Sequence, residues 1–322
     1  MSISNNISLD RVRTDNYYNF KQNFADSPND ASSTIYDNNG HSCDYVEIDD
    51  FSEKILNIEK QISFFSLNIC SLPGKWNELQ NMMNSLHTDK FKFTVISLTE
   101  IWNIPPAVNF NLPGYSPLHF SIRDNTGLNG NAGGGVGMWI DSKYSFEPIQ
   151  KLSVFEPGVF ESQFIKLKTS KNKFSIIGNI YRPNTAAKAN LQKFIQILNG
   201  ILQSIQSDSE LKYCQSIELL GDFNIDLLEH NVHGDTTLYI DTVLNYSLLP
   251  LITLPTRVMH NCALIIDHIL TNAKKDRFDA VILISDILDH FPVFYIKHCK
   301  ESGPPPQYIK TRRVNKKNNS DV

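Results

Sequence analysis

Two polar residues follow an apolar run in the middle of this chain, at a spacing that suits chemistry. The mostly apolar segment Ile217–Leu220 is typical of a buried strand, and Gly221 permits a tight exit from it. Asp222 and Asn224 follow at i and i+2, so on an extended backbone both side chains point to one face. The carboxylate can bind a hard cation or accept a proton from water, and the carboxamide can donate to an oxyanion. Taken alone, residues 219–226 are equally typical of a turn at a strand end.

Polar residues also end or interrupt other apolar runs, and each has a structural alternative. Glu100 could cap a helix, Tyr181 could be a half-buried strand aromatic, and His290 could be an ordinary loop histidine. Because each follows or interrupts an apolar strand, all of them could instead face one cleft. His268 would point to the opposite strand face from its neighbour, so we interpret it as structural. The candidates for the cleft are Asn68, Glu100, Tyr181, Asp222, Asn224, Asp267, Asp289 and His290.

The elements that must position these residues are many strands and few helices. Trp76, Leu79, Met83 and Leu86 recur at helical spacing, and two further helices are predicted over 187–206 and 236–246. Residues 103–132 read as a long binding loop, and the glycines at 133–137 lead into a strand. The order is mixed, which favours an α/β (α+β) fold of two packed sheets with helices outside. The predicted strands are 62–67, 93–98, 136–140, 161–167, 174–181, 217–220, 263–270, 280–285 and 293–298.

Composition limits the class of protein. The 322 residues are 41% hydrophobic and 20% charged, which is typical of a globular protein. No apolar run reaches the roughly 18 residues of a spanning helix, and no signal-peptide pattern opens the chain. The five cysteines form no CxxC pair, so we expect reduced thiols in an intracellular protein.

Charge divides the chain into three parts. Residues 1–60 carry eleven acidic and five basic residues, so the rest of the chain holds a net +2 of the overall −4. We expect 1–60 to be an acidic, largely disordered leader, 61–299 to be the domain, and 300–322 to be a basic Pro/Lys/Arg-rich tail or linker. The near-neutral domain with a basic end permits a polyanionic partner.

Taken together and in order, the motifs resemble the endonuclease/exonuclease/phosphatase superfamily. Within it, the chain looks most like the apurinic-type endonuclease domain of LINE-type (non-LTR) retrotransposons, over residues 61–298. The combination of Gly221–Asn224 with Asp289–Val293 and Ile266–Asn272 is specific, whereas the glycine run alone would be weak. The matching segments are 67–68, 99–102, 133–136, 181–183, 221–224, 255–257, 266–269 and 289–292.

The resemblance implies a four-layer sandwich that cleaves phosphodiester bonds with Mg²⁺, for which Mn²⁺ can substitute. The resemblance makes Glu100 the metal-binding residue, together with Asn68 and Asp289. It makes Asp222 the group that deprotonates the attacking water. It makes His290 the catalytic histidine, oriented by Asp267. The residues it places at the substrate are Asn224, Tyr181, Thr256 and Arg257. Two departures from the family pattern are Leu288, where serine is frequent, and Cys70, where a basic residue is frequent.

The resulting hypothesis is a monomeric, Mg²⁺-dependent DNA endonuclease that nicks one strand for retrotransposon integration. It would bind DNA and no membrane, act in the nucleus, and belong to a longer polyprotein with a reverse transcriptase. Two alternatives stay open on the sequence. One is a phosphatase of the same fold that acts on a small or lipid phosphate ester, and the other is an inactive nucleic-acid-binding remnant.

Overall fold

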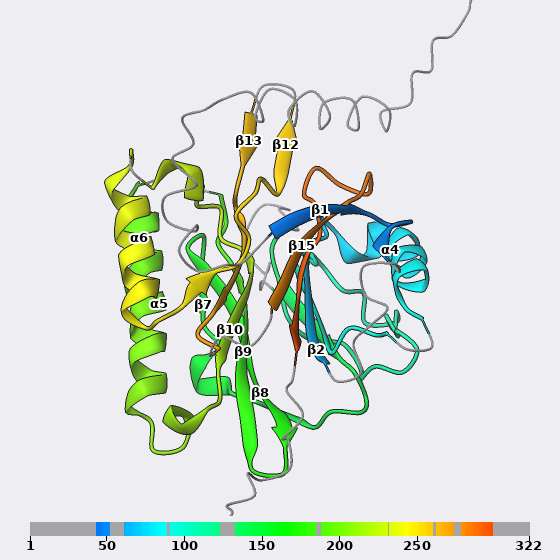
Figure 1. Cartoon of the computed structure of the whole chain (residues 1–322), viewed down its shortest axis with the longest axis horizontal. Helices are drawn as coiled ribbons and strands as arrows, with labels where there is room; N and C mark the ends of the chain where they lie inside the picture. The colour runs from blue at the N-terminus through cyan, green and yellow to red at the C-terminus, as the bar shows by residue number, and fades with distance from the viewer. Residues whose placement is uncertain are drawn as a thin grey trace, which may run out of the picture.

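Two seven-stranded sheets pack face to face and carry helices on their outer sides (Figure 1). The computed structural model describes residues 43–51, 61–88, 91–122, 133–184, 188–230, 232–259, 262–273 and 278–298. Within these ranges, no helix is long and apolar enough to cross a membrane. The expected tail and most of the expected leader lie outside the described residues.

The first sheet has mixed strand directions. Its order is β1 (Cys43–Glu47), β15 (Phe278–Ile284), β16 (Val293–His298), β2 (Gln61–Asn68), β3 (Val95–Thr99), β5 (Val136–Ile140) and β4 (His119–Ser121). β2 and β3 run parallel, with Asn68 opposite Thr99. The carboxyl ends of these two strands therefore meet at one edge of the sheet.

The second sheet repeats this arrangement. Its order is β11 (Leu249–Pro250), β14 (Asp267–Thr271), β10 (Ile217–Asp222), β9 (Lys173–Tyr181), β8 (Phe160–Ser170) and β6 (Phe146–Pro148), and β7 (Phe155–Glu156) pairs with β8. β9 and β10 run parallel, with Tyr181 opposite Asp222. A separate hairpin is formed by β12 (Arg257–Met259) and β13 (Cys262–Leu264).

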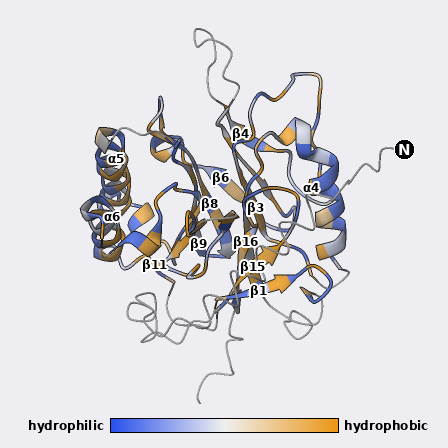
Figure 2. Ribbon diagram, turned by 90° about the horizontal axis from the view of Figure 1, so that it is seen from above, coloured by the Kyte–Doolittle hydropathy of each residue, from blue (hydrophilic) through white to orange (hydrophobic). Residues whose placement is uncertain are grey.

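Three helices complete a four-layer sandwich, which confirms the expected fold class. Seen from above, α4 (Leu72–Leu86) covers the first sheet, while α5 (Lys188–Ser207) and α6 (Gly234–Asn245) cover the second (Figure 2). The Ser71 side chain caps α4 by accepting a hydrogen bond from the Gly74 N–H. Within the described residues, short 3-10 turns also lie at Gln150–Leu152, Leu211–Tyr213 and Leu227–Glu229.

Side chains along β2 alternate between two hydrophobic cores, one on each face of the first sheet. Phe64 packs between the sheets, whereas Phe65 and Leu67 pack under α4. Because successive side chains point to opposite faces, Asn68 lies on the same face as Phe64 and looks toward the second sheet. The register of β2 therefore aims a carboxamide into the space between the sheets.

Gly221 is required by the close approach of two strands. It adopts φ +136°, and a Cβ atom there would lie 1.9 Å from the Ile180 carbonyl oxygen on β9. Only glycine fits that backbone and that gap. This glycine brings the end of β10, and with it Asp222, beside the end of β9.

The expected start of the domain at residue 61 is wrong. β1 pairs in parallel with β15, and Val46 and Phe51 are buried in the core beneath the first sheet. Hydrogen bonds to β15, more than 200 residues away in sequence, stabilise this short polar segment. Its polar composition therefore did not predict a strand of the domain.

Two further expectations need correction. The strand predicted over 263–270 is two strands, because β13 ends at Leu264 and β14 begins at Asp267 in a different sheet. The expected long loop at 103–132 contains β4, which pairs with β5 at the edge of the first sheet. Residues 123–132 of that loop lie outside the described residues.

Candidate active site

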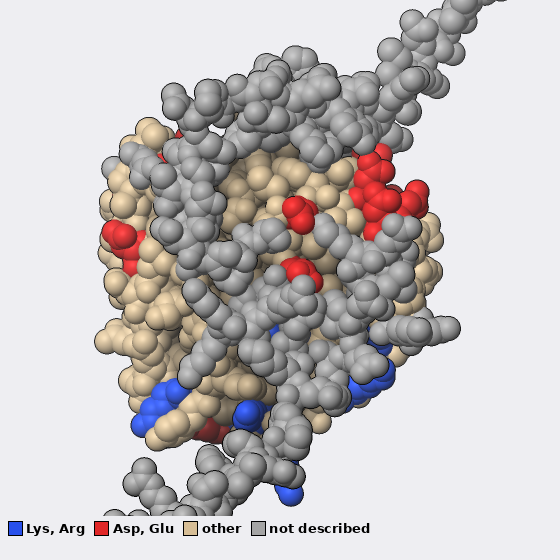
Figure 3. Space-filling view, in the orientation of Figure 1, with Lys and Arg blue, Asp and Glu red and all other residues tan. Residues whose placement is uncertain are grey.

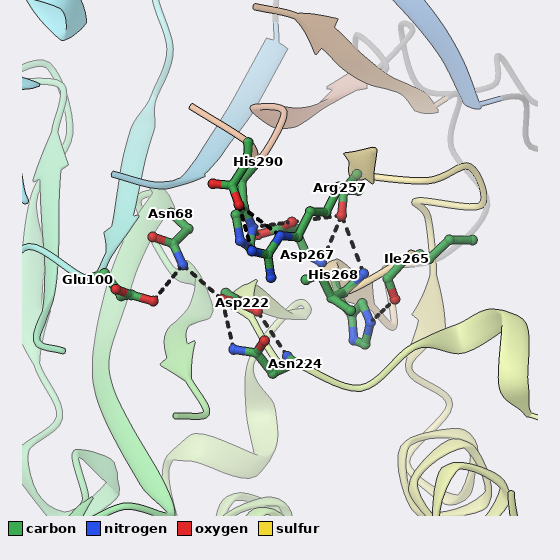
Figure 4. Close-up of polar contacts among 12 residues, drawn as sticks. Asn68, Glu100, Asp222, Asn224, Arg257, Ile265, Asp267, His268 and His290 are labelled. Atoms are coloured by element: carbon green, nitrogen blue, oxygen red, sulfur yellow. Dashed lines mark hydrogen bonds and ion pairs between the residues drawn. The ribbon is translucent and has the colours of Figure 1, made fainter. Parts of the chain in front are cut away.

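The carboxyl ends of β2, β3, β9 and β10 meet at one rim of the sandwich. Asn68 ends β2 and donates its Nδ2 hydrogens to Glu100 Oε1 at 3.0 Å and to Asp222 Oδ2 at 2.9 Å. Tyr181 ends β9 and donates its hydroxyl to Glu100 Oε1 at 2.8 Å. These bonds cross from one sheet to the other, so the candidates at these four strand ends share one site. Figure 4 shows the Asn68 amide between Glu100 and Asp222.

Asn68 presents its nitrogen, not its oxygen, to the carboxylates. Its Oδ1 accepts from the Cys70 N–H at 3.1 Å, which fixes the orientation of the amide. The amide nitrogen, whose lone pair is delocalised into the carbonyl, donates to both carboxylates, so Asn68 holds them together. Its expected role as a metal ligand stays a prediction.

Glu100 sits on a strained backbone and has a partner that the sequence reasoning missed. Glu100 and Trp102 both adopt left-handed φ values, 53° and 60°. The Trp102 indole Nε1 donates to Glu100 Oε2 at 3.3 Å, and the Trp102 N–H donates to the Gly134 carbonyl at 2.8 Å. Non-glycine residues in this region cost free energy and concentrate at functional sites. A tryptophan two residues after a candidate ligand was the available signal.

The glycines at 133–137 support this turn. Gly135 has φ +85°, and a Cβ atom there would lie 2.9 Å from Ile101 Cγ1. The Gly135 N–H donates to Glu161 Oε2 at 2.6 Å. The interpretation of these glycines as a close-packed entry into β5 is confirmed.

Asp222 and Asn224 lie side by side, but not on an extended backbone. Asn224 has φ +47°, and its N–H and Nδ2 donate to the two oxygens of Asp222, each at 2.9 Å. Asn224 Nδ2 also donates to the Arg182 carbonyl at 2.8 Å, and Arg182 Nη1 donates to the Asn224 carbonyl at 2.6 Å. The expected i, i+2 geometry is therefore corrected to a tight turn, in which the amide orients the carboxylate.

His290 and Asp267 form a buried pair. His290 Nδ1 lies 2.9 Å from Asp267 Oδ2 and 3.1 Å from Oδ1. Thr256 Oγ1 donates to Asp267 Oδ2 at 2.7 Å and accepts from the Asp267 N–H at 3.1 Å. Thr256 is 0% exposed and holds Asp267, and its expected contact with substrate stays a prediction.

The site raises the pKa values of both Asp222 and His290. Burial, reinforced by the charge of Asp267, raises the pKa of Asp222 to about 7. Burial alone would lower the pKa of His290, but the Asp267 carboxylate beside it outweighs this effect and raises the pKa to about 9. At neutral pH the site therefore combines an imidazolium with a carboxyl group that can accept a proton.

Arg257 and Asp289 form an ion pair next to His290. Arg257 Nε and Nη2 donate to Asp289 Oδ2 at 2.9 and 2.6 Å. Although burial favours the neutral acid, His290 and Arg257 hold the pKa of Asp289 below its usual value. Asp289 was expected at the metal and Arg257 at the substrate, and the structure pairs them with each other.

His268 is structural, as expected. Its Nδ1 lies 2.9 Å from the Tyr239 hydroxyl, and its Nε2 lies 3.0 Å from the Ile225 carbonyl oxygen. Its ring stacks on Phe223, and it is fully buried. Burial lowers its pKa to about 4, so it packs as a neutral ring.

The donor set fits a hard divalent cation. Ligand atoms of Asp222, Asp267 and His290 all lie within 4.8 Å of one another, but His290 is protonated and paired with Asp267 at neutral pH, so carboxylate oxygens are the available ligands. Glu100 lies beside them and shares the Asn68 amide with Asp222. Mg²⁺ favours carboxylate oxygens and keeps several waters, so the half-buried Glu100 beside the buried Asp222 suits it.

Figure 3 shows the largest visible group of acidic side chains at the upper right, with others scattered over this face, while most of the visible lysines and arginines lie in its lower half.

Similarity to known proteins is visible in structure alone. No protein-family model and no curated protein matches the chain. The AP endonuclease LMAP from Leishmania major superposes with a TM-score of 0.58 at 12% identity, covering 85% of this chain and 97% of that one. Humanized D. rerio TDP2 gives 0.51 at 16% identity, covering 73% and 98%.

A third structure is the endonuclease domain of TRAS1, a telomere-specific non-LTR retrotransposon. It gives a TM-score of 0.50 at 9% identity, covering 74% of this chain and 99% of that one. At such low identities these likenesses establish a shared fold.

Proposed function

The chain has the fold of the endonuclease/exonuclease/phosphatase superfamily, and from its site we propose that it is a Mg²⁺-dependent phosphodiesterase that nicks one strand of DNA. The observation that carries the proposal is the joint placement of Asp222 between two partners. On one side Asn68 ties it to Glu100, and on the other it faces the His290–Asp267 pair.

Glu100, with Asp222 beside it, would hold the cation. A bound Mg²⁺ supplies positive charge to the phosphate oxygens. Tyr181 and Trp102 orient the Glu100 carboxylate by donating to its two oxygens. Burial raises the pKa of Tyr181, so this residue stays a hydroxyl donor at any working pH.

Asp222 is the group that accepts a proton from the attacking water. Burial raises the pKa of Asp222 above its ordinary value, which favours its taking a proton as a general base. Asn224 and Asn68 donate to its oxygens and fix its orientation. The bond from the water oxygen to phosphorus then forms as the bond from phosphorus to the leaving oxygen breaks.

His290 stabilises the charge that develops on the phosphate. Its Nδ1 is taken by Asp267, which leaves Nε2–H to donate to a phosphate oxygen. With a pKa of about 9, the ring stays cationic at neutral pH.

The retrotransposon-type resemblance of the motifs supports DNA as the substrate. The intact set of Glu100, Asp222, Asn224 and His290 favours an active enzyme over an inactive remnant. We extend the proposal to a monomer that acts on nuclear DNA.

A plasmid assay tests the proposal. Supercoiled plasmid with Mg²⁺ should become open-circular with the wild type, and Asp222→Asn should slow this by roughly 10²-fold or more. Asp241→Asn, an exposed aspartate on α6, is the matched control and should nick like the wild type.

The alternatives give different results in the same experiment. Hydrolysis of a chromogenic phosphate monoester without nicking would identify a phosphatase instead. Retention of plasmid in a gel without either activity would identify a nucleic-acid-binding remnant. Either result would contradict the proposed nicking activity.

A further inference from the structure

The N-terminal strand β1 touches the loops that carry the catalytic pair. Tyr45, in the middle of β1, donates its hydroxyl to the Pro255 carbonyl at 2.8 Å. Its ring meets the Phe291 ring edge-on, with centroids 6.3 Å apart and planes at 81°. One side chain therefore contacts two loops that are far apart in sequence.

Each contacted residue is a direct chain neighbour of a site residue. Pro255 precedes Thr256, whose hydroxyl donates to Asp267. Phe291 follows His290, which pairs with Asp267. The two loops are joined by the hydrogen bond from the Phe291 N–H to the Thr256 carbonyl at 2.7 Å. Tyr45 therefore packs across the junction that sets His290 against Asp267.

β1 is anchored firmly enough to act as a support. It pairs in register with β15 from Cys43 opposite Ala280 to Glu47 opposite Ile284. Past the strand, Phe51 is buried and packs edge-on against Phe294, with centroids 5.2 Å apart. Tyr45 is thus attached to the first sheet through β1.

We propose that Tyr45 is a positioning residue that fixes the geometry of His290 against Asp267 through Pro255 and Phe291. Tyr45 contacts Pro255 and Phe291, so it acts on the catalytic pair through the two loops. Small displacements of a catalytic group are costly, because the reacting atoms must be held near their attack geometry. The activity readout rests on the proposed phosphodiesterase function, and the spectroscopic one does not.

The first test is Tyr45→Phe, which removes the hydroxyl and keeps the ring. We expect kcat for plasmid nicking to fall roughly three- to tenfold, as for one lost hydrogen bond, with KM unchanged. Tyr45→Leu also removes the ring contact with Phe291 and should reduce kcat further.

The second readout needs no substrate. The His290 Nδ1 proton, hydrogen-bonded to Asp267, should give a downfield proton resonance in the full-length protein, assigned by its loss in His290→Gln. We expect Tyr45→Phe to broaden or abolish this resonance at the same pH and temperature.

Tyr115→Phe is the matched control. The Tyr115 hydroxyl donates to the Phe93 carbonyl at 2.8 Å, which is the same kind of bond in the outer part of the first sheet. This variant should keep both kcat and the resonance.

The outcomes separate this inference from the proposed function. Unchanged kcat and resonance in Tyr45→Phe, or an equal loss in Tyr115→Phe, would overturn the role of Tyr45. If the wild type nicks no DNA while the resonance still depends on Tyr45, the positioning role stands and the proposed function fails.

Discussion

Asn68 on the first sheet donates to Asp222 on the second, with 2.9 Å between Nδ2 and Oδ2. The same nitrogen donates to Glu100 Oε1 at 3.0 Å. One amide therefore sets the spacing of two carboxylates that come from different sheets. How the two sheets pack on each other decides whether these carboxylates can share a cation.

The His290–Asp267 pair should behave as one unit. His290→Ala should reduce kcat by roughly 10²–10⁴-fold, because it removes a positioned charged donor. Asp267→Asn should reduce kcat less than His290→Ala does, because it misorients the ring without removing it. The double variant should be hardly slower than His290→Ala. Nicking rates of the three variants at fixed Mg²⁺ decide this, and losses that multiply independently would show that the residues do not act together.

Trp102 should affect cation binding more than chemistry. Trp102→Phe keeps a ring but removes the indole N–H that donates to Glu100 Oε2 at 3.3 Å. Loss of such a partner of a metal-binding residue weakens metal affinity by roughly 10–100-fold. The Mg²⁺ concentration at half-maximal nicking should rise by that factor, with the rate at saturation largely restored.

Trp139→Phe is the control for Trp102→Phe. The Trp139 indole donates to the Phe110 carbonyl at 3.1 Å, away from the site. If this variant raises the Mg²⁺ requirement equally, the effect of Trp102 is not specific to Glu100.

Asp222 should destabilise the fold as the pH rises. Its folded pKa of about 7 lies above the unfolded value of about 3.9, so the protonated form is favoured by folding. This contribution is full below about pH 4 and is lost as the pH rises through about 7. Asp222→Asn, which cannot ionise, should therefore gain stability over the wild type by about 1–3 kcal/mol at pH 8.

Urea unfolding without divalent cations at pH 5 and pH 8 measures this effect. The stability gain of Asp222→Asn should be larger at pH 8, and Asp241→Asn should show no such trend. An equal gain at both pH values would show that Asp222 carries no ionisation cost in the fold.

Residues 43–51 should contribute to stability. A chain that begins after Phe51 should melt well below one that begins at Cys43, because burial of Val46 and Phe51 stabilises by roughly 1.5–3 kcal/mol each. In the full chain, Phe51→Ala should cost about 3–5 kcal/mol. Phe155→Ala, at a 39% exposed site, should cost far less, and similar melting of all variants would mean that β1 adds nothing to the core.

The order of the motifs along the chain predicted much of the fold and of the candidate site. Strong helical periodicity placed α4 and α5, and dense apolar runs placed β2, β3, β5, β9 and β10, because burial on one or two faces leaves a local pattern. Polar residues that follow or interrupt apolar runs predicted Glu100, Asp222 and His290 as site residues. Parallel neighbouring strands end at the same edge of a sheet, so the residues at their carboxyl ends lie together there.

Tertiary structure decided what depends on distant partners. β1 is a strand only because β15 offers it hydrogen bonds, and Thr256 is a support only because β14 brings Asp267 beneath it. The direction of the Asn68 amide follows from an N–H at Cys70 on one side and two carboxylates on the other. Periodicity in a sequence records which face is buried, whereas these roles depend on which atoms the other sheet places within hydrogen-bonding distance.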